Sequence, residues 1–137
     1  MENPIIVTAQ VNAPIEKVWE VWNDPEHIVH WNAASPDWHT TKAKNDLREG
    51  GQLICRMEAK DGSSGFDFIG TYDLVKEHEH IAYTLTDGRK VAIDFGANGN
   101  STFIEERFEA ENINSRELQQ SGWQAILNNF KKYIESL

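Results

Sequence analysis

The sequence predicts an α+β fold in which a curved, seven-stranded antiparallel sheet wraps around a long C-terminal helix. Two observations predict it: helical spacing of apolar residues at the C-terminus, and period-two alternation in seven shorter segments. The expected order is strand, two helices, six strands and a final helix. No repeat or linker divides the 137 residues, so we expect one domain spanning residues 1–137.

The C-terminal helix is expected from Ser115 to Leu137. Ser115 can cap its start, Glu117 lies in the first turn, and Lys131 and Lys132 lie near the end, which suits the helix dipole. Glycine inside a helix costs about 0.5–1 kcal/mol relative to alanine, so we expect Gly122 to border a cavity or a close backbone contact. The residues expected on the buried face are Leu118, Trp123, Ile126, Leu127, Phe130, Ile134 and Leu137.

The N-terminal third predicts one strand and two short helices. Residues 5–11 alternate as a half-buried strand does. Pro14 suits the first turn of a helix, whose apolar stripe is formed by Ile15, Val18, Trp19 and Trp22. Asp24 is placed to cap a second helix with Pro25 at its first position and with Ile28 and Trp31 pointing inward.

Beyond Asp37 the pattern predicts six strands separated by turns. Residues 61–65 and the pair Asp87-Gly88 are typical of hairpin connections. Residues 96–100 are expected to form a loop. In the third of these strands we expect one face to carry Phe68, Gly70, Tyr72 and Leu74. The six segments are Asp37 to Lys44, Gln52 to Lys60, Phe66 to Lys76, Ile81 to Leu85, Val91 to Phe95, and Thr102 to Phe108.

Composition excludes several functional classes. Thirteen basic residues against 22 acidic ones give a net charge of −9, which opposes binding to nucleic acid and to anionic membrane surfaces. The single cysteine, Cys55, cannot form an internal disulfide. No apolar run reaches membrane-spanning length and no secretion signal opens the chain, so we expect a cytoplasmic protein.

An ordered set of residues along nearly the whole chain carries a family resemblance: Ala13-Pro14, Val18-Trp19, Asp24-Pro25-Glu26, Trp31, Glu49-Gly50-Gly51, Gly70, Tyr83-Thr84, Thr102 and Gly122-Trp123. In this order they resemble the activator of heat-shock protein 90 ATPase homologue 1-like family, within the START-like or polyketide-cyclase-like (SRPBCC) superfamily. The resemblance implies a helix-grip fold, in which the sheet curls around the last helix and two short helices help to close a cavity.

The superfamily generally binds small apolar or aromatic molecules, and some members catalyse cyclisation, dehydration or hydrolysis. The eukaryotic co-chaperone that gives the family its name carries a further N-terminal domain, whereas this chain begins at its first strand. We therefore expect a binding protein without a cofactor. An enzyme using the same cavity and a chaperone-associated stress-response protein are the alternatives, of which the chaperone partner is not favoured.

Glu106 is the most informative candidate site residue, because period-two counting from Ile104 and Phe108 turns its carboxyl inward. A carboxyl inside an apolar chamber can hold the polar end of a ligand or act as an acid or base. The alternatives are a bulge that turns Glu106 outward or a structural hydrogen bond. The residues expected to line the cavity are Trp31, Trp38, Cys55, Phe68, Tyr72, Tyr83, Phe95, Glu106, Gly122, Trp123 and Ile126.

Other candidate chemistry is weaker. His27 and His30 are spaced to bind one metal, yet no third ligand follows at a recognisable distance, so a solvated helix face is the preferred interpretation and no metal is expected. Known motifs for phosphate binding, zinc proteases and serine hydrolases are absent. We assign no catalytic residue.

Overall fold

A computed structural model describes all residues from 1 to 137. Its strands are β1 (Ile5–Val11), β2 (Trp38–Asn45), β3 (Gln52–Ala59), β4 (Gly65–Lys76), β5 (His80–Leu85), β6 (Lys90–Asn98) and β7 (Ser101–Phe108). Its helices are α1 (Ile15–Asn23), α2 (Pro25–Trp31) and α3 (Arg116–Glu135). The predicted order of elements and the predicted fold class are confirmed. No helix is both long enough and apolar enough to cross a membrane.

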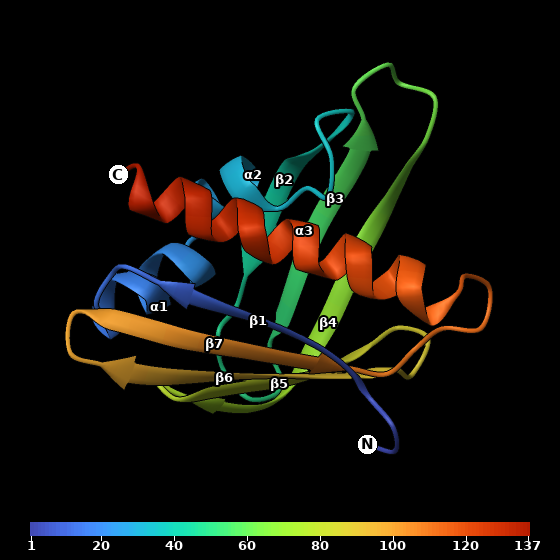
Figure 1. Cartoon of the computed structure of the whole chain (residues 1–137). Helices are drawn as coiled ribbons and strands as arrows, with labels where there is room; N and C mark the ends of the chain where they lie inside the picture. Colours follow the sequence, from blue (N-terminus) through green and yellow to red (C-terminus); the bar gives the residue numbers. More distant parts are fainter.

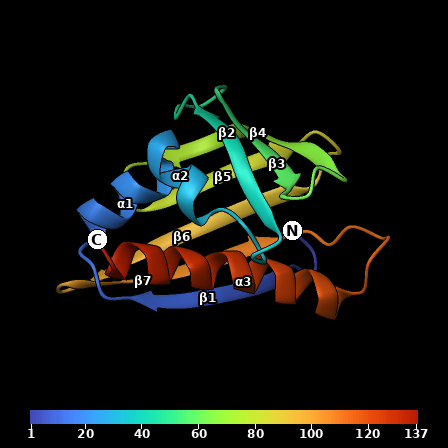
Figure 2. The same ribbon diagram turned by 90° about the horizontal axis from the view of Figure 1, so that it is seen from above.

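The seven strands form one antiparallel sheet in the order β1-β7-β6-β5-β4-β3-β2. Strands β2 to β7 follow one another as a meander, and β1 pairs with β7 at the far edge. The sheet curls: β1, β7, β6 and β5 lie together, while β4, β3 and β2 swing away from them, and α3 crosses the space between the two parts (Figure 1). Seen from above, α3 runs beside β1, and α1 and α2 lie at one end of the sheet (Figure 2).

The helix starts follow the expected local chemistry. The Asp24 carboxylate accepts a hydrogen bond from the backbone N–H of Glu26 at 2.9 Å, and Pro25 occupies the first position of α2. The Ser115 hydroxyl accepts one from the N–H of Leu118 at 3.1 Å at the start of α3. Pro14 precedes α1 as its capping residue rather than lying within the first turn.

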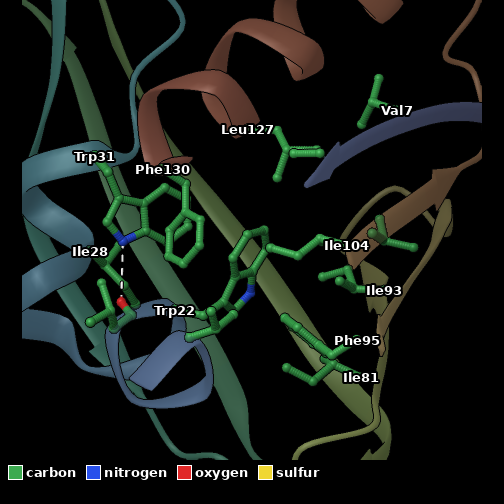
Figure 3. Packing of buried hydrophobic residues seen from close by; sticks show 14 of the residues in the cluster. Val7, Trp22, Ile28, Trp31, Ile81, Ile93, Phe95, Ile104, Leu127 and Phe130 are labelled. Carbon is green, nitrogen blue, oxygen red and sulfur yellow. Dashed lines mark hydrogen bonds between the residues drawn. The ribbon is translucent and has the colours of Figure 1, made fainter. Parts of the chain in front are cut away.

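Aromatic rings form the part of the core between the helices and the sheet. Trp22 of α1 lies at its centre, with Phe130 of α3 and Trp31 of α2 on one side at centroid distances of 4.8 and 4.9 Å (Figure 3). The indole N–H of Trp31 donates to the carbonyl of Val21 at 3.2 Å, which satisfies a buried donor. This cluster holds the two short helices against α3.

The free edge of the sheet at β1 is covered by side chains of α3. Long polar side chains of α3 donate hydrogen bonds to the backbone carbonyls of every second residue in β1. These carbonyls point away from the sheet. The pairs are Gln120 to Ile6 at 3.1 Å, Gln124 to Thr8 at 3.0 Å and Lys131 to Gln10 at 2.7 Å. An unpaired edge would otherwise offer these carbonyls to another strand, so α3 protects it.

The structure contradicts the predicted position of Leu74. The pairing of β4 with β5 shifts between Tyr72 and Leu74, as a β-bulge does, so Leu74 pairs with Ala82 and Val75 with the buried Ile81. Val75 therefore packs against the core in place of Leu74.

Two residues predicted on the buried face of α3 are exposed. Leu118 is 59% exposed and Leu137, beyond the last helical residue, is 55% exposed. In the first turns of α3 the inward position belongs to Gln119, whose amide donates to the carbonyls of Glu111 and Asn114. Gln119 thereby ties the preceding loop to the helix.

The connection between β6 and β7 is shorter than predicted. Strand β6 continues to Asn98, so only Gly99 and Asn100 form the turn, and Gly99 adopts a φ of +63°. The predicted loop over residues 96–100 is too long, because Gly96, Ala97 and Asn98 belong to β6 although glycine and asparagine are common in turns.

Candidate functional site

A pocket of about 430 Å³ lies between the sheet and α3, with α1 and α2 at one end. Twenty-one residues line it, and 15 of them are hydrophobic. The volume falls within the range of small-molecule sites, which are mostly apolar with a few placed polar groups. This pocket is therefore the candidate functional site.

Ten of the eleven residues predicted to line a cavity border this pocket: Trp31, Trp38, Cys55, Phe68, Tyr72, Tyr83, Glu106, Gly122, Trp123 and Ile126. The remaining one, Phe95, does not. Its ring packs edge-on against Trp19 and Trp22, at centroid distances of 5.4 and 5.6 Å, so it lies in the core behind Trp22.

Trp31 and Trp38, both predicted to line the cavity, lie at different depths. Trp31 is only 6% exposed and packs between Trp22 and Phe130, so it forms an inner wall. Trp38 is partly exposed and lies 5.9 Å from Phe66, ring centroid to centroid. Phe66 is 48% exposed, which places this aromatic pair at the mouth of the pocket.

The α3 side of the pocket is open at Gly122. A Cβ atom built on this glycine would meet no other atom within 4 Å, although Trp123 beside it is held firmly. The Trp123 ring stacks on Phe108 and contacts Phe68 edge-on. α3 therefore leaves space at Gly122, while Trp123 fixes the position of the helix against the sheet.

Gly70 has the opposite role on the sheet side. A Cβ atom at Gly70 would lie 2.5 Å from Cδ2 of Tyr83, closer than any real contact. The missing side chain lets the Tyr83 ring approach β4 closely at this position, where Tyr83 lines the pocket.

Tyr72 belongs to a hydrogen-bonded network that closes one end of the pocket. Its hydroxyl donates to the side-chain oxygen of Asn45 at 2.5 Å, and the Asn45 amide donates to the carbonyl of Asn23 at 2.9 Å. Burial raises the pKa of the Tyr72 phenol, so it stays neutral and keeps its proton for this bond. The network links β4, β2 and the end of α1.

The Glu106 side chain points inward, as predicted, and is 6% exposed. Burial raises the pKa of its carboxyl to about 8, and no neighbouring charge or hydrogen bond offsets that effect. Because every fully enclosed polar side-chain atom has a hydrogen-bond partner, the unpartnered Glu106 oxygens must be accessible from the pocket. Burial therefore favours the neutral form of the carboxyl at pH 7, and the group faces the pocket.

Tyr83 and Cys55 are two further ionisable groups of the pocket lining. Burial raises the pKa of the Tyr83 phenol well above its ordinary value, and proximity to Glu106 adds to the rise. Burial also raises the pKa of the Cys55 thiol to about 11. A thiol that stays protonated is a poor nucleophile, so Cys55 acts as an apolar wall residue.

Sequence reasoning missed eleven lining residues: Trp22, Asn23, Ile28, Asn32, Ala34, Ser35, Asn45, Leu53, Met57, Phe66 and Ile81. Period-two counting could have found Leu53 and Met57, which lie two residues on either side of Cys55 and therefore on the same face of β3. The asparagines had no such signal, because their positions depend on how the strand ends and loops meet in three dimensions.

His27 and His30 lie outside the pocket lining and both contact Tyr133 of α3. The Nδ1 atom of His27 is 2.7 Å from the Tyr133 hydroxyl oxygen, and the His30 ring stacks on the Tyr133 ring at a centroid distance of 5.7 Å. No group of three or more histidine, cysteine, aspartate or glutamate side chains is arranged to hold a metal ion. The pair links α2 to the end of α3.

The sequence from residue 12 to residue 135 matches the family described as activator of Hsp90 ATPase homolog 1-like protein. Chr148 from Cytophaga hutchinsonii is 56% identical, with a TM-score of 0.85 over 98% of this chain and 93% of that one. An AHSA1-like protein from Aeromonas hydrophila is 44% identical, with a TM-score of 0.87 over 96% and 92%. Protein NE0264 from Nitrosomonas europaea, 16% identical with a TM-score of 0.83 over 97% and 94%, shares the fold. No curated protein sequence matches the chain.

The family match spans all the residues that carried the resemblance, and the similar structures have the same fold. The chain therefore belongs to the activator of Hsp90 ATPase homolog 1-like family, within the START-like superfamily.

Proposed function

We propose that the protein binds a small apolar or aromatic molecule in the pocket between the sheet and α3. The observation that carries the proposal is the pocket itself, with a volume of about 430 Å³ and 15 hydrophobic residues among the 21 that line it. Removing apolar surface from water drives such binding, at about 25 cal/mol per Å² buried. A molecule of one or two fused rings fits this space.

The surrounding packing favours a pocket that exists before the ligand arrives. A hydrogen bond to the carbonyl of Val21 fixes the Trp31 ring, and a hydrogen bond to Asn45 fixes Tyr72. The Trp123 ring is held by stacking on Phe108. Walls fixed in this way need little ordering on binding, which favours affinity. The aromatic pair Trp38 and Phe66 at the mouth supplies the entry route.

Two measurements test this function. Mass spectrometry of the protein purified under native conditions, compared with the same sample after denaturation, should identify a small apolar or aromatic molecule released on unfolding. Calorimetric titration of emptied protein with the neutral aromatic probe naphthylmethanol should give saturable binding of one molecule per chain. Absence of both a released molecule and probe binding would reject the proposal.

A further inference from the structure

Glu106 supplies the only carboxyl group of the pocket, and that carboxyl has no hydrogen-bond partner in the empty protein. Tyr72, Asn45 and Asn23 satisfy one another or nearby backbone, as described above. Glu106 is more than nine-tenths buried, its carboxyl makes no hydrogen bond, and it lines the pocket. Burying a polar group without a hydrogen-bond partner costs free energy. A ligand in the pocket could supply the partner that Glu106 lacks.

The charge distribution of the lining restricts that partner. None of the 21 lining residues is a lysine, an arginine or a histidine, and Glu106 is the only carboxylic acid. An anionic ligand would meet no counter-charge in an apolar space, where isolated charge is expensive. A cationic ligand would find its counter-charge at Glu106 alone.

The walls around Glu106 are also suited to a cation. Eight of the lining residues are aromatic and come from both helices and strands: Trp22, Trp31, Trp38, Phe66, Phe68, Tyr72, Tyr83 and Trp123. Ring faces attract cations electrostatically, and the attraction is stronger where water is excluded. The net charge of −9 adds a long-range attraction for cations and a repulsion for anions.

We propose that the ligand of this pocket is an apolar amine, an aromatic or aliphatic body with one ammonium group that pairs with the Glu106 carboxylate among the aromatic walls. This inference rests on the proposed function, because it names the chemical class that the same pocket accepts.

Binding of an amine is coupled to release of a proton. In the empty pocket burial raises the pKa of Glu106 to about 8, so its carboxyl carries a proton at neutral pH. When the ammonium arrives, Glu106 ionises and its proton passes to solvent, so the pair forms with no change in the ligand's own protonation. The other ionisable groups facing the pocket, Tyr83, Tyr72 and Cys55, all have raised pKa values and stay neutral. The helices contribute no ionisable group to the lining.

A matched series of probes tests the proposal. Naphthylmethylamine, naphthylmethanol and naphthoic acid share one ring system and are respectively cationic, neutral and anionic at about pH 6.5. Calorimetry on the emptied protein should rank them amine first, alcohol second and acid last, with the amine preferred over the alcohol by about tenfold or more. An alcohol or an acid that binds as tightly as the amine would overturn the inference.

Two variants separate the local charge of Glu106 from the overall charge. Glu106→Gln removes the carboxylate and should reduce the ratio of amine to alcohol affinity to near one. Glu105→Gln is the matched control: Glu105 lies next along β7 and pairs with Arg107 at 2.7 Å on the other face, and its substitution makes the same chemical change outside the pocket. Glu105→Gln should keep the preference for the amine. Equal loss in both variants would show only a long-range effect and would overturn the role of Glu106.

Proton release tests the pair in the unaltered protein, independently of how well the variants fold. Titration at about pH 6.5 in two buffers of different ionisation heat should show release of nearly one proton per amine bound and none per alcohol bound. Amine binding without proton release would overturn the inference while leaving the proposed function intact. Failure of all three probes to bind would instead reject both.

Discussion

Trp123 of α3 stacks on Phe108 of β7, with ring centroids 3.9 Å apart and ring planes within 13°. Phe108 is completely buried, so the stack anchors one face of the helix on the sheet. It fixes the rotation of α3 about its axis and turns the preceding residue, Gly122, toward the pocket. Helix packing and pocket shape therefore depend on the same contact.

The space beside Gly122 predicts the effect of a small substitution. Gly122→Ala should stabilise the protein by up to about 1 kcal/mol, because alanine favours the helix and its methyl group meets no atom within 4 Å. Thermal and urea unfolding measure the change. A loss of about 1–3 kcal/mol would instead mean that the sheet presses against the helix backbone there.

A larger side chain at the same position should occupy the pocket. Gly122→Leu is expected to keep the fold, since the added atoms enter empty space, but to lose binding of naphthylmethanol. Ser121→Leu is the matched control, because Ser121 is the neighbouring helix residue and is exposed. Calorimetry on both variants, with melting curves beside it, checks the prediction. Undiminished binding by Gly122→Leu would place the ligand elsewhere.

Burial of Glu106 predicts how stability changes with pH. The pKa of its carboxyl rises from 4.5 to about 8 on folding, so the folded state holds more protons between these values. The stability that Glu106 contributes is complete below about pH 4.5 and is lost as the pH rises toward 8, by about 1.4 kcal/mol per pH unit. Urea unfolding between about pH 5 and pH 8 measures this effect. As the pH rises, the free energy of unfolding of Glu106→Gln should increase steadily relative to that of the parent.

The control for that experiment is Glu105→Gln, whose carboxylate lies outside the pocket beside Arg107. Its stability should follow that of the parent across the same pH range. If the curve for Glu106→Gln also runs parallel to the parent curve, the Glu106 carboxyl titrates normally and faces water. An NMR titration of the carboxyl carbon then reports its pKa directly.

Close packing at Gly70 predicts a loss of stability. A methyl group at this position would lie 2.5 Å from the Tyr83 ring, so Gly70→Ala should force the ring toward the pocket and cost about 1–3 kcal/mol. Unfolding by urea measures the cost, and near-ultraviolet circular dichroism reports the displaced ring. A neutral effect would mean that Tyr83 has room to move.

Sequence periodicity was sufficient to predict the elements and most of the pocket wall. Alternation placed Cys55, Tyr72, Tyr83 and Glu106 on the inner face of their strands, because the register is regular around Cys55 and Glu106 and, in the pairing of β4 with β5, from Gly70 up to Tyr72 and its partner Tyr83. Glu106 could be recognised as unusual because it lies between the apolar Ile104 and Phe108. The direction in which a side chain points from a regular strand depends only on its neighbours in the sequence, so the alternation of residue types was enough to predict it.

The features that were missed depend on the three-dimensional arrangement. The bulge after Tyr72 reverses the faces of Leu74 and Val75, and nothing in the residue types signals it. Phe95 does point inward, yet Trp22 lies between it and the pocket. The bond from Tyr72 to Asn45 joins strands that are not neighbours in the sheet, so only its curl brings them together.

Protection of the β1 edge by α3 gives the last prediction. Gln120 and Gln124 donate to the carbonyls of Ile6 and Thr8, which have no partner strand. The double variant Gln120→Ala/Gln124→Ala should lose about 1–2 kcal/mol of stability, since each exposed hydrogen bond contributes about 0.5–1 kcal/mol net. Urea unfolding measures the loss.

The same variant should also associate through its uncovered edge, which size-exclusion chromatography with light scattering would detect as dimers or larger species at high protein concentration. Gln52→Ala is the control, because the Gln52 amide contacts only the Thr71 hydroxyl at the surface, at 3.3 Å. That control should remain as stable and as monodisperse as the parent. If the double variant behaves like the control, packing of the apolar face of α3 is enough to hold it beside β1, and the glutamine contacts are incidental.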